Sequence, residues 1–150
     1  MRITWPIVAL AFCLGGAANS NRADLARTVF ASHDPNGRLP NTKIEWRGTV
    51  RVEGSQFAIY YLEFINPVSR HGQQRIAVIR NAKEFMGAYQ CTLGNSQWDA
   101  TMVVKKDRIL VTLNYLPTNP QASFVIRFTQ RGPSHNRYFC GEGSGWENGI

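Results

Sequence analysis

The spacing of hydrophobic residues changes near Pro40. Before it, residues 20–32 carry Leu25, Ala26, Val29 and Phe30 at helical spacing, which predicts a short helix and then a loop up to residue 40. After it, residues 42–54 alternate between apolar or small residues and charged ones, which predicts a half-buried strand. The expected apolar face of this strand comprises Ile44, Trp46, Gly48, Val50 and Val52.

Seven further segments are short, rich in β-forming residues and separated by turn residues. They are residues 56–65, 74–80, 85–93, 98–105, 108–115, 123–129 and 136–140. Segment 56–65 is apolar on both faces, which predicts a central strand covered on both sides. The sequence therefore predicts an all-β fold, an antiparallel meander of about eight strands that closes as a flattened barrel or sandwich.

The N-terminus has the features of a signal peptide. Arg2 precedes an apolar run over residues 3–14 and a small-residue stretch over residues 15–18. We expect cleavage after Ala18, with cleavage after Ser20 as an alternative, and export to the bacterial periplasm or the extracellular space. An uncleaved anchor and a lipid on Cys13 are the other possibilities, although the bulky Phe12 before Cys13 disfavours the lipid.

This reading divides the chain into residues 1–18 (or 1–20) as signal, 19–40 as the short helix and loop, 41–140 as the β domain and 141–150 as a flexible tail. No transmembrane segment is expected after cleavage, because the apolar run of the signal is shorter than the roughly 20 residues that a spanning helix needs.

The cysteine count fits export. The chain has three cysteines, and loss of Cys13 with the signal leaves Cys91 and Cys140, which we expect to form a disulfide in an oxidising compartment. In an eight-stranded meander, segments 85–93 and 136–140 run in the same direction but lie on opposite walls of a round barrel. A disulfide between them therefore requires a flattened barrel or sandwich, a last strand that crosses over the end, or a strand count that is off by one.

Composition and motifs give little support for catalysis. The formal net charge is +7, but the basic residues are scattered along the sequence, which favours a solvated face over a specific nucleic-acid site. His33, His71 and His135 share no ligand spacing, so neither a metal nor a cofactor is expected. Because no catalytic motif is present, we do not expect an enzyme.

Two small groups of residues are candidate binding sites. Trp46, Tyr61 and Glu63 are candidates for lining a ligand cavity inside the β domain, since Glu63 interrupts an apolar strand face. The structural alternative for Glu63 is an ion pair with Arg75 or Arg80 on the next strand.

Residues 69–79 (SRHGQQRIAVI) form the second group, a histidine loop that leads into a strand. This segment resembles the periplasmic inhibitors of vertebrate lysozyme, in which a cysteine-bracketed loop carrying a histidine blocks the lysozyme active site. The resemblance implies inhibition of a protein partner through Arg70 and His71, but the bracketing cysteines are missing here. The preferred hypothesis is an exported binding module for a small apolar ligand, an envelope component or a protein partner, with enzyme inhibition as the alternative.

Overall fold

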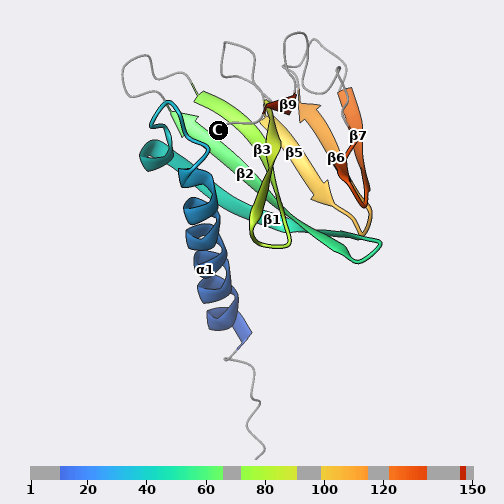
Figure 1. The fold of residues 1–150 in the computed structure, drawn as a ribbon, viewed down its shortest axis with the longest axis horizontal. Helices are drawn as coiled ribbons and strands as arrows, with labels where there is room; N and C mark the ends of the chain where they lie inside the picture. The colour runs from blue at the N-terminus through green and yellow to red at the C-terminus, as the bar shows by residue number, and fades with distance from the viewer. Residues whose placement is uncertain (1–10, 66–71, 91–98, 115–121, 135–145, 148–150) are drawn as a thin grey trace, which may run out of the picture.

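One long helix and two antiparallel sheets make up the fold (Figure 1). The computed structural model describes residues 11–65, 72–90, 99–114, 122–134 and 146–147. Helix α1 (Ala11–Ala31) and the short 3-10 helix η1 (Leu39–Asn41) come first. The strands are β1 (Thr42–Val52), β2 (Ser55–Ile65), β3 (Gly72–Arg80), β4 (Glu84–Gln90), β5 (Asp99–Val104), β6 (Arg108–Asn114), β7 (Ala122–Thr129), β8 (Gly132–Pro133) and β9 (Trp146–Glu147).

The first sheet has the order β1-β2-β3-β4-β9 and the second has the order β5-β6-β7-β8. The expected all-β class with antiparallel pairing is therefore confirmed, and β1 to β7 fall on seven of the expected segments.

The ends of the chain differ from expectation. Among the described residues helix α1 spans Ala11–Ala31 and so extends further toward the N-terminus than the short helix expected over residues 20–32. Strand β8 lies between the expected strands 123–129 and 136–140, and β9 lies within residues 141–150, where Trp146 pairs with Tyr89 of β4. No helix in the described ranges is both long and apolar enough to cross a membrane. The expected strand 136–140 and both cysteines of the expected disulfide, Cys91 and Cys140, lie outside the described residues.

The first sheet is covered on both faces. One face packs against the second sheet through a core of Val50, Phe57, Ile59, Ile76, Val78, Tyr89, Ile109, Val111, Ile126 and Phe128. The other face packs against α1 through Ala26, Phe30, Ile44, Tyr60, Leu62, Ala77, Ile79 and Ala88. Strand β2 contributes to both cores, which explains why its sequence is apolar on both sides.

Helix α1 is attached to the sheet by packing and by one arginine. Phe30 is fully buried and makes edge-to-face contacts with Tyr60 and Phe85, with ring centroids 5.9 and 5.4 Å apart. Arg27 donates to the carbonyl oxygens of Leu39 at 3.0 Å and Thr42 at 2.9 Å, which joins the helix to the start of β1. These contacts fix the helix over the outer face of the first sheet.

A β-bulge divides β1 into two halves that face opposite ways. Trp46 pairs with Tyr60 but Gly48 pairs with Ile59, so one extra residue is inserted in β1 at this point. Ile44 therefore packs toward α1, whereas Val50 packs toward the second sheet. The single apolar face expected for residues 44–52 is wrong, because the inserted residue reverses the side-chain alternation.

Gly48 is required where the bulge meets the second sheet. Its φ is 152°, and a Cβ atom placed there would lie 2.9 Å from the Cβ of Val104. We expect Gly48→Ala to lower the free energy of unfolding by about 2–3 kcal/mol, because a well-packed contact must shift. Urea denaturation followed by circular dichroism measures this.

Gly37→Ala is the matched control, since Gly37 also has a positive φ of 62° but no atom within 4 Å of its added Cβ. Equal effects of the two glycine substitutions would contradict the close approach of β1 and β5.

Tyr89 connects the first sheet to the end of β8. Its ring is fully buried, and its hydroxyl donates to the carbonyl oxygen of Ser134 at 2.7 Å. Burial raises the pKa of this phenol well above its ordinary value. The folded state therefore keeps a proton that the unfolded chain releases above about pH 10.

We expect the free energy of unfolding to be insensitive to this group below about pH 10 and to fall as the pH rises above it. Tyr89→Phe should make that alkaline decline shallower, although it also removes one hydrogen bond. Urea titrations at several values between pH 8 and 11 test this, with Tyr61→Phe as the control variant at a half-buried ring. A decline of the same slope in all three proteins would show that Tyr89 does not titrate in this way.

Candidate functional site

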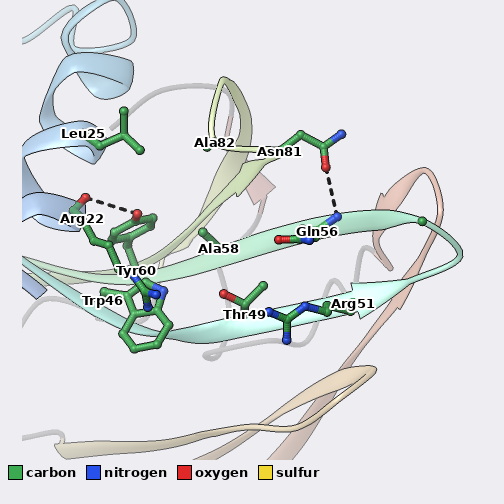
Figure 2. Close-up of a pocket in the computed structure, with 11 residues that line it drawn as sticks. Arg22, Leu25, Trp46, Thr49, Arg51, Gln56, Ala58, Tyr60, Asn81 and Ala82 are labelled. Atoms are coloured by element: carbon green, nitrogen blue, oxygen red, sulfur yellow. Dashed lines mark hydrogen bonds between the residues drawn. The ribbon is translucent and has the colours of Figure 1, made fainter. Parts of the chain in front are cut away.

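An open groove of about 470 Å³ lies between α1 and the outer face of the first sheet (Figure 2). This volume falls in the range of small-molecule sites. Its lining residues come from α1, from β1 and β2, and from the turns that join β1 to β2 and β3 to β4. They are Arg22, Leu25, Trp46, Thr49, Arg51, Gly54, Gln56, Ala58, Tyr60, Asn81 and Ala82.

The bulge in β1 determines which side chains enter the groove. Without the extra residue, Trp46 and Arg51 would fall on opposite faces, because they are an odd number of positions apart. The bulge reverses the alternation, so Trp46 before it and Thr49 and Arg51 after it all line the groove. An aromatic ring, a hydroxyl and a guanidinium are thereby placed along one strand.

The helix supplies a second guanidinium and an exposed apolar side chain. Arg22 lies over the indole of Trp46, with its guanidinium carbon 3.9 Å from the ring centroid. Leu25, three residues later and on the same side of the helix, is 45% exposed. The sequence pattern grouped Leu25 with the packing residues, but Ala26 and Phe30 perform that role and leave Leu25 at the groove.

The groove is electropositive. Arg22 and Arg51 are its charged lining residues, and neither an aspartate nor a glutamate lines it. Within the described part of the chain, neither arginine makes an ion pair. By contrast, a second open hollow, of about 440 Å³, shares Asn81 with the groove, and there Arg80 is bound by Glu84 at 2.6 Å.

Two hydrogen-bonded contacts hold the walls of the groove in place (Figure 2). Tyr60 donates its hydroxyl to the carbonyl oxygen of Arg22 at 3.3 Å, which links the sheet to the helix. Burial raises the pKa of Tyr60, and the nearby Arg22 cation opposes that shift, so the phenol is a neutral donor at neutral pH. Asn81 donates its N–H to the carbonyl of Gln56 at 2.8 Å and accepts the N–H of Gln56 at 3.0 Å through its side chain.

The turn between β3 and β4 has an unusual backbone. Asn81 and Ala82 both have positive φ, at 48° and 60°, and Lys83 donates its N–H to the carbonyl of Arg80 at 3.1 Å. Two successive positive φ angles define the tight hairpin turn that matches strand twist. Alanine in this region is strained, because its Cβ crowds the backbone there.

Of the three residues expected to share a cavity, Trp46 alone lines the groove. Tyr61 and Glu63 follow Ile59 on the alternate positions of β2 and therefore lie on the side of the first sheet that faces the second. The inter-sheet core is filled by buried side chains. The candidate ligand site is therefore the groove under α1 and not the inside of the β domain.

Neither arginine expected beside Glu63 is its cross-strand neighbour. Glu63 lies opposite Lys43 on β1 and Gln74 on β3. Arg80 is bound by Glu84, and Arg75 pairs in register with Leu62, one position from Glu63 and therefore on the opposite face. The register therefore places neither of the two arginines directly opposite Glu63.

The remaining sequence-based expectations are not addressed by the described residues. Arg70 and His71 lie outside them, so inhibition of a partner through that loop stays a prediction. Among the described residues, no cluster of three or more histidine, cysteine or acidic side chains is arranged to hold a metal ion.

Sequence reasoning missed Arg22 and Arg51. The spacing of Arg22 and Leu25 on the helix was the signal that could have found the first. Gly48, an isolated glycine within the strand pattern, was the signal for the bulge that turns Arg51 toward the groove. A comparison with protein families, with curated proteins and with solved structures gives no match for this chain.

Proposed function

We propose that this protein is a binding module whose groove under α1 takes a small anion with a flat apolar part. The observation that carries this proposal is the pair of guanidiniums, Arg22 and Arg51, in a groove of about 470 Å³ that no carboxylate lines. A carboxylate, sulfonate or phosphate that enters the groove would meet either guanidinium without competition from a lining carboxylate of the protein.

The other groove residues suit the apolar part of such a ligand. Trp46 contributes an indole ring, one face of which is covered by Arg22, and Leu25 contributes an exposed aliphatic side chain that helix packing does not use. Thr49, Gln56 and Asn81 add polar groups that orient the ligand. The sequence alone suggested a small apolar ligand, and the groove adds the requirement that this ligand carry an anionic group.

Binding of an aromatic sulfonate tests the groove. We expect 8-anilinonaphthalene-1-sulfonate to bind the folded chain, detected by its fluorescence, and Arg51→Gln to weaken that binding about tenfold because one charge-assisted contact is lost. Trp46→Leu should weaken it as well, since the flat ring is replaced.

Arg47→Gln is the matched control, because Arg47 is on the same strand but is paired with Glu45 outside the groove. The uncharged analogue N-phenyl-1-naphthylamine should bind Arg51→Gln and the unchanged protein alike. A tenfold loss for both arginine variants, or none for either, would remove the groove from consideration.

We also propose that the chain is exported and that Cys91 and Cys140 form a disulfide in a flattened, sandwich-like β domain. Support comes from Tyr89, two residues before Cys91. Its hydroxyl binds Ser134, and its backbone pairs with Trp146. Cys140 is six residues from Ser134 and six from Trp146 in the sequence. Six residues of extended chain span about 20 Å, so Cys140 lies within about 20 Å of both contacts of Tyr89.

Peptide mapping without reduction tests the crosslink. Protein purified from an oxidising compartment should give a peptide pair joined through Cys91 and Cys140, and the first residue of the mature chain should be Asn19 or Asn21. Two free thiols on protein with an intact N-terminus would contradict both the disulfide and export.

A further inference from the structure

The outer face of the second sheet is arranged in bands of different chemistry. Side chains alternate along each strand, and those of Ile109, Val111, Ile126 and Phe128 point into the inter-sheet core. The intervening positions of β5, β6 and β7 therefore point outward, away from the first sheet and from α1. Antiparallel register then joins these outward positions into rows across the three strands.

The row nearest the β5–β6 turn is cationic. Arg108 on β6 lies directly opposite Arg127 on β7, and the backbone N–H of Lys105, which follows β5, donates to the carbonyl of Arg108 at 2.8 Å. Asp107 forms an ion pair with Arg108 at 2.8 Å. Within the described residues, Arg127 and Lys105 make no ion pair, although the charge of Arg127 is near enough to Asp107 to help lower the pKa of that carboxyl.

Like charges placed directly opposite each other on neighbouring strands destabilise a sheet. The Arg108–Arg127 pair is therefore a cost to folding that the described contacts offset only through Asp107. An anion bound across this row would remove the cost. Lys106 and Arg131, both exposed, extend the positive charge along the adjoining turns.

The next row is apolar and open to solvent. Val103 pairs with Leu110, and Leu110 pairs with Val125, so three aliphatic side chains form a continuous line across β5, β6 and β7. Val103 is 43% and Val125 40% exposed, and Leu110 is half-buried. The row beyond it carries Thr101 opposite Thr112. We call these three rows together the banded face.

We propose that the banded face docks on an anionic lipid bilayer, with the cationic row at the level of the lipid phosphates and the apolar row in the interfacial region. A cationic band beside an aliphatic band is the pattern with which proteins lie on membranes. Single-stranded nucleic acid is bound largely by stacking on aromatic rings, and the described outward residues of these rows are not aromatic. This proposal is independent of the groove, which lies on the opposite side of the first sheet.

Vesicle co-sedimentation of the full chain tests the banded face. We expect binding to vesicles of phosphatidylglycerol and phosphatidylcholine, weak binding to phosphatidylcholine alone, and weaker binding at about 0.5 M salt, where surface charges are screened. Lys105→Gln combined with Arg127→Gln should reduce binding to the anionic vesicles about 25-fold, which corresponds to about fivefold for each charge.

The matched control is Lys43→Gln combined with Arg47→Gln, which removes the same net charge from exposed residues beside Glu45 on β1. It should retain nearly full binding. Val103→Ser with Val125→Ser should lower the binding that remains at high salt, and circular dichroism checks that every variant is folded.

Equal vesicle binding by the banded-face variant and the control variant would overturn the proposal. Equal binding of the protein to charged and uncharged vesicles would also overturn it, because binding would then be assigned to the apolar N-terminus. A DNA duplex or heparin that competes fully with vesicles, or that binds when vesicles do not, would also overturn it in favour of a general polyanion site. Loss of vesicle binding in Arg51→Gln would show that the groove, and not the banded face, contacts lipid.

Discussion

The extra residue in β1 between Trp46 and Gly48 determines which side chains of this strand enter the two cores and the groove. It lets one strand serve two cores, since Ile44 packs under α1 and Val50 packs under the second sheet. The close approach of Gly48 to Val104 is possible because glycine has no side chain there. The same reversal carries Arg51 to the side of Trp46, so the groove exists because the strand changes faces.

Helix α1 forms the second wall of the groove. It covers the half of the outer face where Phe30 and Ala26 are buried, and it leaves open the part beside the β1–β2 and β3–β4 turns. Arg27 joins the helix to the start of β1, and Tyr60 joins it to β2 at the groove itself. The groove is therefore held by contacts that are part of the fold, and a ligand need not order it first.

The sequence was sufficient to locate the strands, but it was insufficient to determine which face of the sheet each side chain occupies. Alternation identified β1, β-forming residues between turn residues identified β2 to β7, and the apolar character of β2 correctly indicated cover on both sides. The apolar alternation did not show the bulge, because apolar residues continue at even positions of β1 when the faces exchange; only the isolated Gly48 marks it. For that reason Trp46, Tyr61 and Glu63 were expected to share one cavity, while Arg22, which contacts Trp46, and Arg51, which lines the same groove, were passed over.

The arrangement of charged residues could not be predicted from the sequence either. Lys105, Arg108 and Arg127 are scattered in the sequence, and only antiparallel register places them in one row. A solvated face is the reasonable interpretation of such scattered charges until the register is known. In the fold, two electropositive regions result, one under α1 and one on the outer face of the second sheet, and the first sheet and the inter-sheet core separate them. Because they face opposite directions, a protein lying on an anionic membrane through the banded face would keep its groove open to ligand on the side away from the lipid.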